Sequence, residues 1–354
     1  MSGLSTELLN SLASGVLAVD LENRIVFLNR AMARRIGVKA EEWVGRHAAE
    51  LLGLVAPRLV SAEEEFGSRL AWQRDPKAKH SHQLEWKTGD QTIYLREDSA
   101  PLRDAAGQII GRVFVYHEIS REKAIDRMKS EFIAVASHEL RTPMTSIKGG
   151  VDLILSGFAG EISADTQELL EIAQKSCDRL IRLINDILDL SKIEAGQVKL
   201  NLVLMDLADV VERSIRGVKQ LADQSEVELR IERPAELPPV EVDKDRMEQV
   251  VTNLLSNAIK FAPARSQVRV ELSAADGWVQ CSVVDQGTGI PETEMHRVFG
   301  KFQQMGDRKR GGTGLGLAIT QALVHEHRGK IWVESRVNQG SSFIFRIPAA
   351  HSGH

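Results

Sequence analysis

The sequence predicts a multidomain protein in which a small α+β domain, a helical hairpin and an α/β sandwich follow one another. A length of 354 residues exceeds that of one typical compact domain. Strand-like and helical patterns mix in residues 1–118, whereas apolar residues follow helical spacing in residues 119–196. Helical and strand-like runs then alternate through residues 197–354. We expect the domain boundaries at these two changes of pattern.

Composition narrows the classes of partner and compartment. Lys and Arg (45) nearly balance Asp and Glu (49), so nothing indicates a face that binds nucleic acid directly. Cys177 and Cys281 lie far apart and form no metal-binding spacing, which fits a reducing compartment. The first residues do not resemble a secretory signal, and no run of about 18 apolar residues occurs. We therefore expect a soluble, cytoplasmic chain without a membrane span.

The first region mixes short strands and helices. GVLAVDLENRIVFLN, residues 15–29, predicts two strands around a turn, and NRAMARRIG predicts a helix that ends at Gly37. HQLEWK, QTIYLREDSAPL and IIGRVFVYHEIS then predict three antiparallel strands. This region resembles the PAS sensory fold over about 100 residues, most clearly at residues 15–29 and in the closing strand RVFVYHEIS.

The resemblance leaves the ligand of the sensor region unknown, and a scaffold or dimerisation module without any ligand is an equal alternative. No cysteine falls within residues 1–118, which excludes a flavin photosensor that forms a cysteine adduct. His47, His80 and His82 could in principle ligate haem. We expect them to be exposed loop histidines instead.

Two amphipathic helices follow. Ile125, Met128, Phe132 and Val135 recur at steps of three and four, which is the seam of a coiled coil. The glycines of SGFAGEIS, residues 156–163, interrupt the pattern before a second apolar series begins. A hairpin of this kind cannot bury both faces alone, so we predict a homodimer whose paired hairpins form a four-helix bundle. The alternative is a hairpin packed on its own chain.

The third region contains a helix with a polar face. In DRMEQVVTNLLSNAIKFAP, Asn253, Asn257 and Lys260 lie on one side, opposite an apolar side. An amide oxygen suits Mg²⁺, and a lysine beside it suits phosphate. Taken alone, paired asparagines on a helix are more often simple polar surface.

Two glycine-rich stretches come next. In VVDQGTGIP, Asp285 ends an apolar strand and could accept a hydrogen bond from an exocyclic amine such as that of adenine, although in isolation a tight turn is the more common explanation. In MGDRKRGGTGLGLAITQ, four glycines lead into a helix whose first N–H groups form an anion site. Gly312 stands where a P-loop requires lysine, so the stretch is not a P-loop. The basic residues before it could close over phosphates as a lid or form a solvated loop.

The order of these stretches is more specific than any one of them. NLLSNAIKF, DQGTGI, VFGKFQQ, GGTGLGLAI and QGSSF, in this order, resemble the nucleotide-binding boxes of the histidine-kinase ATPase domain, whose fold is shared with gyrase, Hsp90 and MutL proteins. Phe299 and Phe302 match its aromatic box, and Asn257 matches the Mg²⁺ ligand. The resemblance implies an ATP site formed by Asn253, Asn257, Lys260, Phe261, Asp285, Gly287, Gly289, Phe302, Arg308, Lys309, Arg310, Gly312, Thr313, Gly314, Leu315, Gly316, Ser341 and Ser342.

The stretch ASHELRTPMTS, residues 136–146, lies about 115 residues upstream. Together with the five boxes it resembles the sensor histidine kinases of two-component systems over about two-thirds of the chain. An imidazole with the reference pKa of about 6.5 is mostly neutral at physiological pH and can attack a γ-phosphate. The resemblance implies that His138 is the phosphoacceptor, Glu139 the acid/base, and a response-regulator aspartate the next acceptor. It also implies that Thr142 helps to dephosphorylate that partner.

Two other classes share parts of this pattern. An ATP-driven clamp or chaperone of the same ATPase fold would lack the SHELRTP helix, so the sequence argues against it. A degenerate, non-catalytic module would not be expected to keep His138, Asn257 and Asp285 together. Whether ATP in one subunit serves the histidine of the same or of the other chain is left open.

Overall fold

The computed structural model describes residues 3–60, 77–88, 91–198, 200–303 and 313–350. The chain divides into two compact units, Met1–Met128 and Lys129–His354. The predicted residues Arg308, Lys309, Arg310 and Gly312 lie outside the described ranges.

The first unit is built on a five-stranded antiparallel sheet with strand order β2-β1-β5-β4-β3. The strands are β1 (Gly15–Asp20), β2 (Ile25–Leu28), β3 (His80–Thr88), β4 (Gln91–Arg103) and β5 (Ile109–Glu118). The three antiparallel strands and the first two strands expected from the sequence are thereby confirmed.

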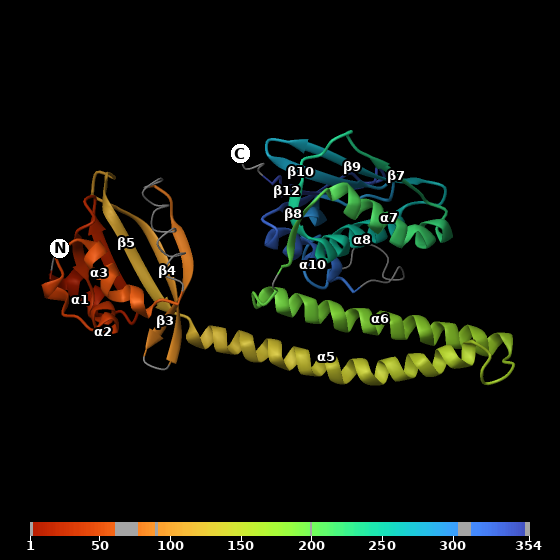
Figure 1. Ribbon diagram of the computed structural model, residues 1–354, viewed down its shortest axis with the longest axis horizontal. Helices are drawn as coiled ribbons and strands as arrows, with labels where there is room; N and C mark the ends of the chain where they lie inside the picture. The colour runs from red at the N-terminus through yellow and green to blue at the C-terminus, as the bar shows by residue number, and fades with distance from the viewer. Residues whose placement is uncertain (1–2, 61–76, 89–90, 199, 304–312, 351–354) are drawn as a thin grey trace. The chain divides into compact units, whose positions relative to one another are not determined.

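Short helices cover one face of this sheet (Figure 1). They are α1 (Gly3–Ser11), α2 (Arg30–Ile36) and α3 (Ala48–Val55), with 3₁₀ turns at Ala40–Glu42 and Ala56–Arg58. Helix α2 ends where predicted, because Gly37 adopts the left-handed conformation (φ 83°) that glycine tolerates best. Met32 and Ile36 of α2 pack on Leu95 and Phe114 of the sheet in one buried core.

The second unit begins with the predicted helical hairpin. Its helices are α5 (Ser120–Leu155), which starts in the first unit, and α6 (Ala164–Glu194), whose first turn is capped by Ser163. Side-chain pairs hold the antiparallel helices together: Lys148 Nζ lies 2.6 Å from Asp178 Oδ1, and Arg141 Nη2 donates to Asn185 Oδ1 at 2.6 Å. No helix in the described part of the chain combines the length and apolar character needed to cross a membrane.

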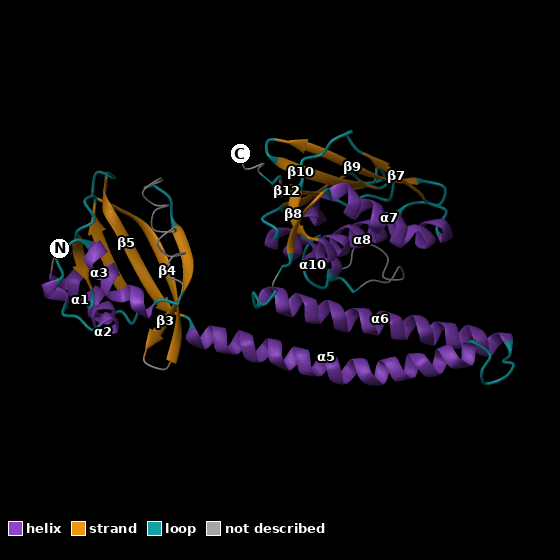
Figure 2. Ribbon diagram, in the orientation of Figure 1, coloured by secondary structure: helices purple, strands orange, loops and turns teal. Residues whose placement is uncertain are grey.

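The remainder of the second unit is an α/β sandwich (Figure 2). Its main sheet has strand order β11-β12-β10-β9-β7 and is mixed, because β7 and β9 are parallel and the other neighbours are antiparallel. The strands are β7 (Glu228–Glu232), β9 (Gln267–Ala275), β10 (Trp278–Val284), β11 (Lys330–Ser335) and β12 (Ser341–Pro348). Strands β6 (Leu202–Met205) and β8 (Val240–Asp243) form a separate two-stranded sheet, which the sequence did not indicate.

Helices α7 (Leu207–Gln224), α8 (Lys244–Phe261) and α10 (Gly316–Glu326) lie on one face of the main sheet, and α9 (Glu292–Met295) is a single turn (Figure 2). The apolar side of α8, including Met247, Val250 and Leu254, is fully buried against the sheet. This burial turns the polar side of α8 away from the core, toward the residues of the predicted nucleotide site.

A buried histidine joins the far ends of the two helices that carry that site. His327, at the C-terminal end of α10, accepts a hydrogen bond at Nε2 from the backbone N–H of Asp243, the residue that caps α8 (2.9 Å). Its Nδ1 lies 2.7 Å from the carbonyl oxygen of Leu323, which can only accept, so Nδ1 carries the proton. His327 therefore fixes α8 and α10 relative to each other.

His327→Ala is expected to lower the free energy of unfolding by about 2 kcal/mol, because the backbone N–H of Asp243 loses its acceptor and the buried imidazole leaves a cavity. His325→Ala is the matched control, since His325 lies on the same helix and is exposed. It should change the free energy of unfolding by less than about 0.5 kcal/mol. Urea unfolding of both variants measures the difference. Equal losses of stability would contradict the role of His327 in fixing α8 and α10 relative to each other.

Candidate functional site

The predicted phosphoacceptor is well exposed on α5. The side chains of His138 and Glu139 are 75% and 77% accessible, and His138 Nδ1 lies 3.5 Å from Glu139 Oε1. Thr142, one turn later, donates from Oγ1 to the carbonyl oxygen of His138 at 3.3 Å. The imidazole is therefore open to solvent, with a carboxylate beside one of its two nitrogens.

The helix continues through Pro143 after this histidine. Proline cannot donate to the carbonyl of Glu139, so a bend is expected just after the histidine. Helix α5 nevertheless continues to Leu155 as a single bowed helix (Figure 1). Hydroxyls bond back to carbonyls four residues earlier on both sides of the proline, from Thr142, Thr145 and Ser146. Such bonds favour curvature rather than a break.

Asp285 forms the innermost part of the predicted nucleotide site. It follows β10, is 5% exposed, and accepts at Oδ1 from the backbone N–H groups of Gly287 (2.7 Å) and Ser341 (3.3 Å). Burial raises the pKa of the Asp285 carboxyl, and these two hydrogen bonds partly offset the rise. Its Oδ2 accepts from no residue in the described part of the chain. The carboxylate is thus oriented by its own loop and by the start of β12, with one oxygen left for a ligand.

Glycine is required beside Asp285 for packing of the chain itself. Gly289 has a φ of +67°, and a Cβ there would overlap the backbone of Arg336. A Cβ on Gly287 would stand 2.7 Å from both Asp285 Oδ1 and the carbonyl oxygen of Phe261. These glycines let two loops and the end of α8 approach one another, and so shape the pocket indirectly.

The two asparagines of α8 have different surroundings. Asn253 Nδ2 donates to Thr320 Oγ1 on α10 at 2.8 Å, and a Cβ on Gly316 would lie 2.5 Å from Asn253 Oδ1. Asn257 is half-buried and has no hydrogen-bond partner among the described residues. Lys260 Nζ lies 5.1 Å from the ring centroid of Phe261. Asn253 therefore joins α8 to α10, whereas the amide of Asn257 is open to a ligand.

This difference predicts separable effects of two similar variants. Asn253→Ala should lower the free energy of unfolding by about 1–2 kcal/mol, because the buried hydroxyl of Thr320 loses its donor. Asn257→Ala should change stability by less than about 0.5 kcal/mol and should remove the Mg²⁺ dependence of ADP binding. Thermal unfolding and ADP titrations with and without Mg²⁺ check both. Full Mg²⁺ dependence in Asn257→Ala would rule out the ligand role.

The loop before α10 is described from Thr313 onward. Thr313 Oγ1 accepts from the backbone N–H of Leu315 (3.3 Å) and donates to Asp186 Oδ2 on α6 (2.6 Å). Gly314 has a φ of +71°, Leu315 is fully buried, and Gly316 begins α10. The loop thus delivers the free N–H groups of the α10 N-terminus beside Asn253, as an anion site requires.

The remaining predicted residues divide into structural and exposed ones. Phe299 packs edge-on against Phe343 (centroids 6.4 Å apart), whereas Phe302 is 64% exposed with a φ of 59°. Ser341 is buried, with its Oγ 2.9 Å from Ser335 Oγ, and Ser342 pairs with Val284 across the sheet. Sequence reasoning missed Asp186, Thr320, Ser335 and His327, because each acts through a hydrogen bond to another helix, strand or loop and belongs to no recognisable motif.

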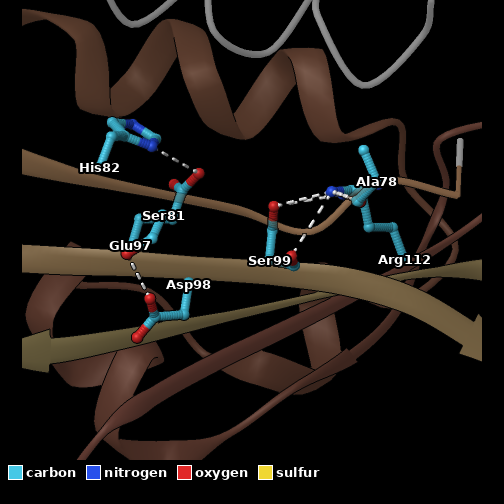
Figure 3. Close-up of polar contacts among 7 residues, drawn as sticks. All are labelled: Ala78, Ser81, His82, Glu97, Asp98, Ser99 and Arg112. Atoms are coloured by element: carbon cyan, nitrogen blue, oxygen red, sulfur yellow. Dashed lines mark hydrogen bonds and ion pairs between the residues drawn. The ribbon is translucent and has the colours of Figure 1, made fainter. Parts of the chain in front are cut away.

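The sensor region has a buried polar cluster on its sheet (Figure 3). Arg112 of β5 is 2% exposed and donates to Ser99 Oγ of β4 (3.2 Å from Nε) and to the carbonyl of Ala78 (2.8 Å from Nη2). His82 Nδ1 lies 3.8 Å from Oε1 of buried Glu97. Arg112 therefore ties the segment that enters β3 to the centre of the sheet.

The expectation for the sensor histidines was partly wrong. His80 and His82 lie in β3, with buried Nε2 atoms, rather than in exposed loops; His47 is exposed and caps α3. No cluster of three or more metal-ligating side chains occurs among the described residues. A cavity of about 20 Å³, lined by apolar residues such as Leu17, Leu84 and Trp86, has room for about one water and is too small for a haem or flavin ring.

Comparisons with known proteins agree with this architecture. Residues 9–124 match the family model of the PAS fold, residues 128–196 that of the His Kinase A (phospho-acceptor) domain, and residues 242–351 that of the histidine kinase-, DNA gyrase B- and HSP90-like ATPases. The whole-chain fold class expected from the sequence is thereby confirmed.

Individual proteins are similar over much of the chain. Sensor histidine kinase WalK of Bacillus subtilis is 30% identical over 348 residues, which cover 95% of this chain and 54% of WalK. Alginate biosynthesis sensor protein KinB of Pseudomonas aeruginosa is 29% identical, covering 96% and 56%. The chain thus spans about half the length of the curated relatives it matches. The crystal structure of full-length ShkA in complex with AMPPNP is 29% identical with a TM-score of 0.55, covering 63% of this chain and 47% of ShkA. By these matches, the chain belongs to the family of sensor histidine kinases.

Proposed function

We propose that this chain is an ATP-dependent protein histidine kinase of a two-component system. ATP phosphorylates His138, and an aspartate of a response regulator then receives the phosphoryl group. Residues 1–118, 119–196 and 197–354 would be the sensor, phosphotransfer and catalytic domains. The observation that carries this proposal is that one compact unit contains both an exposed imidazole on a hairpin helix and a buried carboxylate, one of whose oxygens accepts from no described residue.

The residues around Asp285 suit an adenine nucleotide. Its Oδ2 can accept from the exocyclic amine, while Oδ1 stays bound to Gly287 and Ser341. The N-terminus of α10 and Lys260 offer positive charge for the phosphates. The AMPPNP bound to ShkA is a nucleotide of the same kind. The basic residues 308–310 would add to this charge.

Asn257 is the residue that would hold Mg²⁺, because its amide oxygen is a hard ligand and has no partner among the described residues. When bound, the ion would neutralise charge on the transferring phosphoryl group. The asparagine lies on the same side of α8 as Asn253 and Lys260.

The geometry at His138 supports different roles for its two ring nitrogens. Nδ1 faces Glu139 Oε1 at 3.5 Å, so this carboxylate can hold the Nδ1 proton. Nε2 is then the unprotonated nitrogen, and its lone pair attacks the γ-phosphorus of ATP. The N–P bond forms as the bond to the β,γ-bridging oxygen breaks, and ADP leaves with that oxygen.

Thr142 supports a second activity, dephosphorylation of the response regulator. Its Oγ1 lies one helical turn from the histidine and, within the described ranges, is bonded only to the carbonyl of His138, at 3.3 Å. This hydroxyl can turn to position a water for attack on a phosphorylated aspartate.

We further propose a homodimer. Ile125, Met128, Phe132 and Val135 are all exposed in the single chain, Phe132 by 74%, although their spacing is that of a packing seam. Pairing with the hairpin of a second copy would bury this stripe.

Incubation with Mg²⁺ and ATP labelled at the γ-phosphate tests the proposed activity. We expect label that is lost in acid and retained in base, as for a phosphoramidate. ATP labelled at the α-phosphate is the control and should leave no label on the protein. Acid-stable label would indicate transfer to a hydroxyl, and absence of any label would contradict the proposal.

A further inference from the structure

One face of α6 is covered by the ATPase domain of the same chain. Leu183, Ile187 and Leu190 pack against the buried core of that domain, and Ile193 belongs to it. These residues recur at steps of three and four, so they form one stripe along the helix. We call this stripe, with the acidic residues Asp186 and Asp189 beside it, the α6 dock.

Polar contacts accompany the apolar ones. Asp189 Oδ2 accepts from Gln249 Nε2 of α8 at 3.0 Å and lies 3.4 Å from Arg246 Nη1. Asp186 Oδ2 accepts from Thr313 Oγ1 at 2.6 Å. Of the two aspartates, only Asp186 contacts the loop that leads into α10.

The Asp186 contact places a negative charge at the proposed phosphate site. Thr313 is bonded to the N–H of Leu315, the residue immediately before the first turn of α10. A triphosphate bound at that turn carries several negative charges and would be repelled by a carboxylate so close to the loop. Burial raises the pKa of the Asp186 carboxyl, and the hydrogen bond from the Thr313 hydroxyl partly offsets this rise.

The docked domain faces α6 rather than the helix that carries His138. Arg141 is bonded to Asn185 and Ser130 to Ser191, so His138 and Asp186 lie at a similar level of the hairpin but on different helices. Among the described residues, none from α5 belongs to the buried core of the ATPase domain or packs against it. Within one chain, the domain must therefore leave the α6 dock before a γ-phosphate at α10 can approach His138.

We propose that Asp186 is a latch that holds the ATPase domain on α6 through Thr313 and that nucleotide phosphates displace. This inference rests on the proposed nucleotide site. Because coupling between two sites is reciprocal, a nucleotide that weakens docking must itself bind more tightly when the latch is absent. The docked population lowers the apparent affinity for nucleotide in the intact chain.

Asp186→Ala in the full chain should bind Mg²⁺–AMPPNP about tenfold more tightly than the wild type, the effect of one lost hydrogen bond to a charged group. Hydrogen exchange along residues 183–193 should rise in this variant without nucleotide to the level of the nucleotide-bound wild type. Asp186→Asn keeps an oxygen that can accept from Thr313 but lacks the negative charge. Residues 183–193 of this variant should therefore stay protected from hydrogen exchange when nucleotide binds. Glu168→Ala is the matched control, an exposed acidic residue of α6 away from the dock.

The outcomes separate the two proposals. Wild-type protein that binds no AMPPNP would overturn the proposed nucleotide site, and the latch with it. Wild-type protein that binds AMPPNP as tightly as Asp186→Ala would overturn the latch alone, as would exchange at residues 183–193 that does not respond to nucleotide.

Discussion

His138→Gln is expected to reduce protein-bound label from γ-labelled ATP to background. Glutamine approaches histidine in size and polarity but offers no ring nitrogen with a free lone pair for attack on phosphorus. Because the side chain is 75% exposed, the free energy of unfolding should change by less than about 0.5 kcal/mol. Loss of label therefore reports on chemistry rather than on folding, and the nucleotide affinity should be unchanged.

His325→Gln is the control for this experiment, since His325 is also exposed on a helix but lies in the ATPase domain. The His325→Gln variant should become labelled at the wild-type rate. Label that persists in His138→Gln would mean that another histidine is the acceptor and would remove the assigned roles of Glu139 and Thr142 as well.

Asp285→Asn is expected to weaken ADP binding by about 100-fold. The amide oxygen can keep the hydrogen bonds from Gly287 and Ser341, but an N–H₂ group would then face the amine of adenine where Oδ2 now lies. A hydrogen bond to a charged group contributes about 1.5–3 kcal/mol, and the opposed donors add to the loss. The fold should be retained, because the amide also removes a charge whose burial raises the pKa of Asp285.

A change of the nucleotide base tests whether Asp285 recognises adenine. Inosine diphosphate presents a carbonyl oxygen where adenine has its amine, so it should bind Asp285→Asn better than ADP does, while the wild type prefers ADP. Titration calorimetry with both nucleotides on both proteins measures the four affinities. An equal loss of affinity for ADP and for inosine diphosphate in the variant would show that Asp285 supports the loop rather than recognises the base.

Local patterns were sufficient for most of the elements. Helix α8 forms over the stretch in which the sequence predicts it, because Asp243 caps its first turn and the 3.6-residue repeat of apolar residues runs to its end. The five sheet strands of the sensor region follow from alternating runs bounded by turn formers. The glycine-rich boxes could also be recognised from the sequence. Positions with a positive φ, or where two backbones approach closely, favour glycine.

Contacts between distant segments were outside the reach of these patterns. Asn253 and Asn257 look equivalent along the helix, yet only Asn253 meets Thr320, because α10 crosses α8 at that level. His80 and His82 belong to a strand whose start the flanking sequence does not mark, so the sequence did not predict that they are partly buried, with their Nε2 atoms inside.

The sequence by itself determined the order of the domains, the family, and His138, Asn257 and Asp285 as the residues to test, because each depends on residue type and spacing within a short segment. Only the tertiary structure decided which polar groups are already occupied: Asn253 by Thr320, Ser341 by Ser335, and Thr313 by Asp186. The physical reason is that hydrogen bonds between segments 6 to 127 residues apart depend on how helices and strands pack, which no local period encodes.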